Sequence, residues 1–303
     1  MLKNIGIFQG TIIEQSLISY NEFITHVTFD NSDPMDREIN IYYPIIEKGL
    51  HKDFDYSGII SKSFGEKTGL HIDLVRSIIS RSQSDIYIFS PHQYEEKVWQ
   101  NIWDQTYIFH EKSISLIQQT LNSIGYPNLE ISDLHQTPWC FSHCWFATRE
   151  IFEDIAKDLI LINKEMKNNF LSQNKVTNYS ALETPSKGEV KKDYILRPFA
   201  MERIVGYLIK QKLEKNYKLF IYKDPRNFEK SMHSHLKPLN QRYIKIIEES
   251  QRNFSESDLQ NNSRRNIYSD LIFTENIGDE ISKYCDTEFT IERLNKLKYS
   301  NYF

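Results

Sequence analysis

The sequence lacks several features that would assign it to a special class of protein. Only three cysteines occur among 303 residues, and this odd and small number fits a reducing compartment. No run of about 18 apolar residues occurs, so we expect no transmembrane helix. The first residues lack a basic segment followed by an apolar run, so we expect no signal peptide. Together these absences predict a cytoplasmic protein, with peripheral contact at the inner face of the plasma membrane left open.

The chain also lacks a strong excess of charge of one sign. Its 37 basic and 41 acidic residues give a net charge of −4. This balance predicts no general attraction to nucleic acid or to an anionic membrane. Hydrophobic residues make up 40% of the chain and aromatic residues 13%, which is enough to form a packed core. The length allows one α/β domain of about 200–250 residues with an appendage, or two smaller domains.

Strand-like and helix-like segments alternate over the first 220 residues. We predict strands at 5–8, 25–29, 56–61, 85–89, 139–147 and 217–222. We predict helices at 37–48, 71–80, much of 93–124, a stretch that follows Thr148, and 198–213. The alternation predicts an α/β layered domain over residues 1–224, with a polar mobile insertion or lid at 164–193. Residues 225–303 are predicted to form a mostly helical C-terminal extension.

Asp85 is a candidate for binding a diphosphate. In open α/β sheets, ligands lie beyond the carboxyl ends of the strands, whereas Asp85 begins its strand unless the strand starts earlier, at Ser82. Many metal-dependent transferases carry an Asp-x-Asp pair, in which two carboxylates share a divalent cation with the diphosphate. Tyr87 takes the place of the second acid in this chain. Either Asp85 acts alone or cationic side chains replace the metal, and the simpler alternative is an aspartate that caps a turn.

The segment 62–69, predicted to be a polar loop, offers two cations beside two glycines. Lys62 and Lys67 would neutralise the charge of a diphosphate. The segment is not a P-loop, because the order Gly-x-x-x-x-Gly-Lys-Ser/Thr is absent. A solvated basic loop is an equally good interpretation.

The predicted strand 139–147 combines polar and aromatic residues. Ser142, His143 and Trp145 would line an acceptor site, since an aromatic face packs well against the C–H groups of a sugar. Strand alternation puts Ser142 and Cys144 on one face, and His143 and Trp145 on the other. A zinc site is disfavoured because Cys140 and Cys144 would then point away from His143. The alternative is a core histidine beside a core tryptophan.

Glu202 lies in the first turn of the predicted helix 198–213, where the helix dipole favours a carboxylate. In a pocket it would deprotonate an acceptor hydroxyl or position the sugar. The alternative is a salt bridge to Arg203 or Arg197, or a simple preference for acids at helix starts.

The order of these segments resembles bacterial glycosyltransferases encoded in capsule, O-antigen and lipooligosaccharide loci, including an uncharacterised domain family common in those loci. The resemblance spans about residues 5–215 and depends on the order of the segments more than on any single one. The similar segments are Ile7–Gln9, Phe29–Asn31, Asp36–Glu38, Asp55–Phe64, Glu66–Gly69, Asp85–Pro91, Phe141–Ala147 and Phe199–Arg203.

The resemblance implies a GT-A-like (Rossmann-like) mixed sheet flanked by helices. It implies a nucleotide on the N-terminal strands, a diphosphate near Asp85, an acceptor near 141–145 and Glu202 as the catalytic carboxylate. Because Tyr87 stands where the second acid would be, two mechanisms stay open. One depends on Mn²⁺ or Mg²⁺ with Asp85 as a ligand, and the other needs no metal. The candidate substrate-binding residues are Phe8, Gln9, Lys62, Lys67, Asp85, Tyr87, Ser142, His143, Trp145 and Arg203.

We therefore expect a hexosyl- or N-acetylhexosaminyl-transferase that moves a sugar from a nucleotide sugar to a bacterial surface glycan or lipid-linked glycan. A second hypothesis is a non-catalytic nucleotide-sugar or glycan-binding partner in a polysaccharide-assembly complex. A third is a nucleotidyltransferase, which would need clustered acids for Mg²⁺. Asp30, Asp33 and Asp36 offer such a cluster, although their proline-containing turn fits a surface loop better.

Overall fold

The computed structural model describes residues 3–12, 23–29, 36–91, 101–127, 129, 137–172 and 197–223. Its strands are β1 (Ile5–Ile12), β2 (Thr25–Phe29), β3 (Tyr56–Ile60), β4 (Ile86–Ile88), β5 (Trp145–Thr148) and β6 (Leu219–Ile221). Its helices are α1 (Ile39–Glu47), α2 (Phe64–Thr68), α3 (Ile72–Arg81), α5 (Ile102–Ser123), α7 (Arg149–Ser172) and α8 (Arg197–Leu213). Two short 3₁₀ turns lie at Leu50–Asp53 and Phe141–His143.

The described strands form one mixed sheet in the order β2-β1-β3-β5-β4-β6. Among these strands, β5 alone runs antiparallel to its neighbours, β3 and β4. The parallel strands β1, β2, β3, β4 and β6 therefore end at the same edge of the sheet, where β5 begins. We call this the carboxyl edge and the opposite one the amino edge. The α/β class predicted from the sequence is confirmed.

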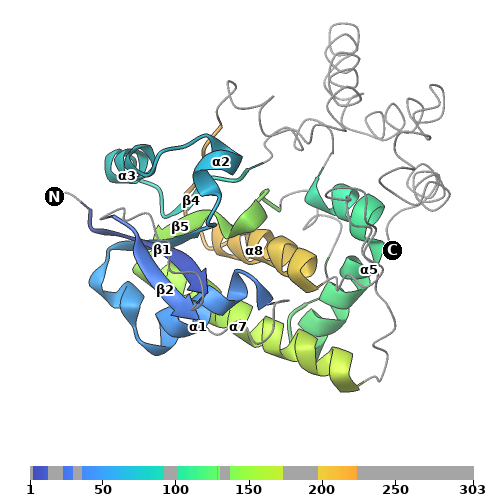
Figure 1. Ribbon diagram of the computed structural model, residues 1–303. Helices are drawn as coiled ribbons and strands as arrows, with labels where there is room; N and C mark the ends of the chain where they lie inside the picture. Colours follow the sequence, from blue (N-terminus) through green and yellow to red (C-terminus); the bar gives the residue numbers. More distant parts are fainter. Residues whose placement is uncertain are drawn as a thin grey trace, which may run out of the picture.

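Helices cover both faces of the sheet, as Figure 1 shows. On one face, α2 and α3 pack against the strands through buried residues that include Phe64, Val75 and Ile79. On the other face, α1, α5, α7 and α8 form a larger core. The central strand β3 is buried along its whole length, which is why its sequence, Tyr-Ser-Gly-Ile-Ile, shows no alternation of apolar and charged residues.

Most of the predicted elements are present, and three differ. The predicted strand 139–147 is wrong over most of its length, because Phe141–His143 forms a 3₁₀ turn and β5 begins only at Trp145. The predicted loop 62–69 contains the short helix α2. Helix α7 continues to Ser172, into the segment predicted as an insertion. The rest of that segment and the predicted C-terminal extension lie outside the described residues.

Length and hydropathy of the described helices bear on membrane insertion. In the part of the chain that the structure covers, none of the helices is both long enough and apolar enough to span a bilayer.

A buried histidine ties the loop before β3 to α7, and this contact predicts a pH dependence of stability. His51 is fully buried, and its Nε2 lies 3.2 Å from Oε2 of Glu153. The other oxygen of Glu153 lies 2.7 Å from Nζ of Lys157. Lys157, followed by His51, lowers the pKa of Glu153 to about 2. Because the folded pKa lies below the unfolded one, this stabilisation is complete above the unfolded pKa and is lost as the pH falls toward 2.

We expect Glu153→Gln to lower the free energy of unfolding by about 1 kcal/mol at neutral pH. The difference from the wild type should shrink as the pH falls from about 5 toward 2. Urea unfolding at a series of pH values measures both effects. Glu150→Gln removes the same charge from an exposed position on α7 and serves as the control. If the free energies of unfolding of Glu153→Gln and the wild type differ by the same amount at every pH, the stabilisation does not come from the ionised Glu153 carboxylate.

Candidate functional site

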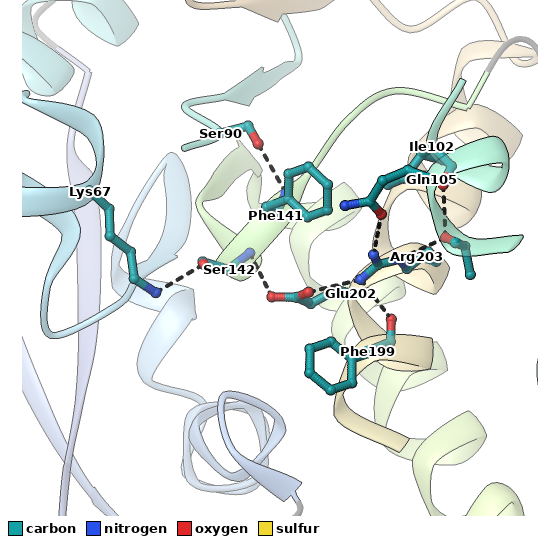
Figure 2. A network of polar contacts seen from close by, with 10 residues as sticks. Lys67, Ser90, Ile102, Gln105, Phe141, Ser142, Phe199, Glu202 and Arg203 are labelled. Atoms are coloured by element: carbon teal, nitrogen blue, oxygen red, sulfur yellow. Dashed lines mark hydrogen bonds and ion pairs between the residues drawn. The ribbon is translucent and has the colours of Figure 1, made fainter. Parts of the chain in front are cut away.

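Four segments meet at the carboxyl edge of the sheet. Lys67 comes from α2, Ser90 follows β4, the turn Phe141–His143 precedes β5, and Glu202 comes from α8 (Figure 2). Hydrogen bonds link them although they lie far apart in the sequence. This edge is where open α/β sheets bind their ligands, so the cluster is the candidate site.

The turn Phe141–His143 has a strained backbone. Ser142 and His143 have φ values of 56° and 52°, in the left-handed region that residues with a side chain avoid. Three bonds hold it: the Phe141 N–H donates to Ser90 Oγ at 3.0 Å, the Ser142 N–H to Glu202 at 3.1 Å, and the Cys144 N–H back to the Phe141 carbonyl at 3.4 Å. Backbone strain that the surroundings enforce in this way is typical of binding and catalytic sites.

Glu202 is held in place while part of its carboxylate faces solvent. Its Oε1 accepts the Ser142 N–H, and its Oε2 lies 3.0 Å from Nη1 of Arg203. The side chain is 22% exposed. The predicted helix-dipole effect is wrong in detail, because α8 starts at Arg197 and its first turn carries no acid. The orientation of Glu202 therefore comes from Arg203 and Ser142.

Arg203 lies behind Glu202 in the protein interior, where it is 1% exposed. Its Nε donates to Thr106 Oγ1 at 2.9 Å and its Nη2 to Gln105 Oε1 at 2.6 Å. Its Nη1 also donates to the Phe199 carbonyl at 3.2 Å, and the guanidinium lies over the ring of Phe141. The structure thus places this candidate substrate-binding residue among protein groups only, where it orients Glu202. The salt bridge weighed as the simpler role of Glu202 is present.

A cation approaches Ser142 from the side opposite Glu202. Lys67 is half-buried on α2, and its Nζ donates to Ser142 Oγ at 3.2 Å. An ammonium and a carboxylate therefore flank one serine, as Figure 2 shows. Lys62, the other predicted cation, is exposed at the surface just before α2. The Lys67 ammonium at this position could hold a negatively charged group next to the Glu202 carboxylate.

The side chains of His143, in the turn, and of Trp145, at the start of β5, are buried in the core. Trp145 is fully buried and packs against Phe152, so it does not offer a face to a sugar. Its Nε1 donates to the Tyr42 hydroxyl at 2.9 Å, and that hydroxyl lies 3.1 Å from His143 Nδ1. The simpler interpretation, a core histidine beside a core tryptophan, describes their burial. Nothing in the sequence pointed to Tyr42, because it lies in the middle of a helical apolar stretch.

Burial disfavours the thiolate form of both cysteines near this turn. It raises the pKa of Cys140 well above its ordinary value, and it raises that of Cys144 to about 12. A cysteine nucleophile reacts as the thiolate, so neither thiol is a candidate nucleophile.

The two candidate residues on β1, Phe8 and Gln9, differ in their surroundings. Phe8 is fully buried and packs edge-on against Phe54 in the core. Gln9 is half-buried near the carboxyl edge, where its side-chain amide donates to the Ser61 carbonyl at 3.2 Å. Gln9 therefore lies near the candidate site. Phe8 is a core residue and does not face the site.

Asp85 and Tyr87 are not brought together with this site. Asp85 lies just before β4, at the amino edge, and its Oδ2 accepts the Lys218 N–H at 2.7 Å. Tyr87 is fully buried, and its hydroxyl accepts a hydrogen bond from Ser82 Oγ at 2.8 Å. In the structure, the Asp85 carboxylate joins the residues just before β4 and β6, which is a structural contact but differs from the turn cap weighed as the simpler alternative.

The described residues do not fit a cation shared with a diphosphate at Asp85. Its carboxylate is engaged by the backbone and lies at the edge opposite Glu202. Within the described ranges, no three His, Cys, Asp or Glu side chains form a group that would hold a metal ion. Asp36, from the acidic cluster weighed for a nucleotidyltransferase, is instead paired with Arg197 and Lys167. Asp30 and Asp33 lie outside the described residues.

The remaining members of the site, Ser90 and Gln105, were not singled out from the sequence. Ser90 follows a predicted strand and precedes a proline, which is a usable signal for the carboxyl end of a strand. Comparisons of the chain with protein-family models, curated proteins and solved structures found no match.

Proposed function

We propose that the protein is a glycosyltransferase that moves a hexosyl or N-acetylhexosaminyl group from a nucleotide sugar to a bacterial surface glycan or lipid-linked glycan. The supporting observation is the placement of Lys67 and Glu202 on either side of Ser142 at the carboxyl edge. The mixed sheet with helices on both faces is compatible with the GT-A-like fold that we propose for such an enzyme.

The chemistry of transfer requires two kinds of group. In the proposed reaction, the acceptor hydroxyl loses its proton to the Glu202 carboxylate while its oxygen bonds to the anomeric carbon. The bond from that carbon to the diphosphate breaks, and the electron pair leaves with the nucleoside diphosphate. The Lys67 ammonium offsets the charge that develops on this leaving group. Mn²⁺ or Mg²⁺ remains a proposal without assigned ligands, and no step here depends on it.

The first experiment measures the thermal unfolding midpoint with a panel of nucleotide sugars and free nucleotides. Ligand binding to the native state raises the midpoint, and a ligand at 100 times its Kd stabilises by about 2.7 kcal/mol. We expect a shift of several degrees for nucleotides of one base. Parallel series with Mn²⁺, Mg²⁺ and EDTA measure the contribution of a divalent cation. The absence of a shift with every nucleotide would overturn the proposal.

The variant Lys67→Met tests whether the Lys67 ammonium contributes to nucleotide binding. Loss of one charge-assisted hydrogen bond is expected to weaken nucleotide binding about tenfold or more. Lys52→Met removes the same charge from an exposed position in the turn after α1, far from the carboxyl edge, and should leave the affinity unchanged. Equal affinities for the two variants would remove Lys67 from the binding site.

The second candidate function is a non-catalytic nucleotide-sugar or glycan-binding partner in a polysaccharide-assembly complex. The observation that favours it is the engagement of both Glu202 oxygens by the protein, which is also what a purely structural carboxylate shows. Release of the nucleoside diphosphate in the presence of acceptors separates the two functions. Nucleotide binding without product across a range of acceptors would favour the binding partner.

A further inference from the structure

Three buried polar side chains, one of them from the strained turn, are linked by hydrogen bonds in the core. Trp145 Nε1 lies 2.9 Å from the Tyr42 hydroxyl oxygen, and that oxygen lies 3.1 Å from His143 Nδ1. All three side chains are 1% exposed or less. The rings of Tyr42 and His143 lie 5.7 Å apart, and those of Tyr42 and Trp145 are stacked at 6.5 Å. The packing therefore fixes the positions of the three groups that share these bonds.

The direction of each bond follows from the chemistry of the groups. An indole N–H only donates, so the Tyr42 oxygen must accept from Trp145. The Tyr42 oxygen has a second lone pair, so the distance alone would also allow His143 to donate. Among the described residues, however, His143 Nδ1 is the acceptor within reach of the phenol proton, and donation from Tyr42 to Nδ1 leaves no buried donor unpaired. A neutral imidazole carries one proton, so when Nδ1 accepts, the proton is on Nε2.

We infer that Tyr42 is a positioning residue that fixes His143 as the neutral, Nε2-protonated tautomer. In this form the Nδ1 lone pair of His143 is taken up by the Tyr42 hydroxyl, so the imidazole has no free lone pair with which to act as a base. The acceptor proton in the proposed transfer therefore goes to Glu202. This last step depends on the proposed function, whereas the tautomer of His143 does not.

The surroundings of His143 favour the neutral form on balance. Burial lowers the pKa of His143, while two carboxylates, Glu38 before α1 and Glu202 on α8, act in the opposite direction. Burial raises the pKa of Tyr42, so its phenol keeps the proton that it donates. The neighbouring thiols of Cys140 and Cys144 are protonated, and thus uncharged, for the same reason. Lys67, the cation of this site, bonds to Ser142 and not to the imidazole.

Nitrogen NMR of the full chain tests the tautomer without any substrate. Two-bond ¹⁵N–¹H correlation spectra distinguish the two neutral tautomers and the imidazolium, and the spectrum of His143→Gln identifies the His143 signals. We expect the Nε2-protonated form in the wild type at neutral pH. Tyr42→Phe should give a mixture of tautomers at His143. An Nδ1-protonated or charged His143 in the wild type would overturn the inference, whether or not Tyr42→Phe folds.

A matched pair of glutamine variants tests the catalytic consequence. The side chain of His143→Gln accepts through its oxygen and donates through its nitrogen, as the inferred tautomer does, but it cannot act as a base. Since loss of a general base costs about 10²–10⁴-fold in rate, we expect transfer by His143→Gln to stay within about tenfold of the wild type. Glu202→Gln should lower the rate of transfer by the full 10²–10⁴-fold expected for loss of a general base. Equal, large losses would overturn the assignment of the base. If the wild type transfers no sugar, the proposed function fails while the NMR result still decides the tautomer.

Discussion

Replacement of Glu202 by glutamine is expected to lower kcat for sugar transfer by about 10²–10⁴-fold and to leave the affinity for the donor unchanged. The amide cannot take the proton of an acceptor hydroxyl. Its oxygen can still accept the Ser142 N–H, which lies 3.1 Å from Oε1 in the wild type, so the strained turn keeps its support. Steady-state rates and nucleotide titrations on the same preparation separate the two quantities.

The control for this variant is Glu66→Gln, which removes the same charge from an exposed position on α2. Transfer by Glu66→Gln should match that of the wild type. An active Glu202→Gln enzyme would remove Glu202 from the role of base. A parallel loss of donor binding and of thermal stability would show instead that Glu202 mainly supports the turn.

The engagement of Glu202 by the protein is compatible with a role as base. An ionised carboxylate offers about four lone-pair positions, and the contacts with Ser142 and Arg203 use two of them. The 22% exposure of the side chain leaves the others within reach of a substrate. Fixing a carboxylate in this way reduces the ordering that it must undergo in the transition state, which is how positioned groups accelerate a reaction. The buried bonds of Arg203 to Gln105 and Thr106 supply the rigidity.

The sequence predicted the layered fold because its signals are local. The uncharged run of β3 and the spacing of Val75 and Ile79 in α3 reflect burial against the sheet, which each segment carries in its own residues. The pairing of Glu202 with Arg203 was likewise predictable, since the two are adjacent in the sequence.

The turn before β5 was not predictable, because no local pattern determines it. The residues 139–147 are aromatic and apolar enough to read as a strand. Ser142 and His143 adopt left-handed backbones because Ser90 and Glu202, 51 and 60 residues away from the atoms they bond, hold the turn in place. Strand alternation already put His143 and Trp145 on one face, but their shared partner Tyr42 lies 101 and 103 residues away in the sequence, where no local pattern connects it to them. Tertiary bonds of this kind override local preference, and they do so at the candidate site.

A second variant with a large expected effect is at Asp36, and here the effect is on the stability of the helices that surround the site. This buried carboxylate joins three segments: the residues just before α1, the C-terminal half of α7, and the first residue of α8. Its Oδ1 lies 2.8 Å from Nη2 of Arg197 and accepts from Asn163 Nδ2 at 2.9 Å, and its Oδ2 lies 3.4 Å from Nζ of Lys167. The side chains of Asp36 and Arg197 are 9% and 6% exposed, so water screens their interaction weakly.

We expect Asp36→Ala to lower the free energy of unfolding by about 3 kcal/mol, because loss of one partner leaves the buried Arg197 guanidinium without this carboxylate. Urea unfolding measures the change. Asp154→Ala removes a carboxylate that is 63% exposed and 3.1 Å from Lys212, a pair that also joins α7 to α8, and should cost less than about 1 kcal/mol. Similar losses of unfolding free energy for the two variants would show that the buried pair of Asp36 and Arg197 contributes no more to stability than an exposed pair does. Since Arg197 begins the helix that carries Glu202, Asp36→Ala should also reduce sugar transfer at temperatures where the protein is still folded.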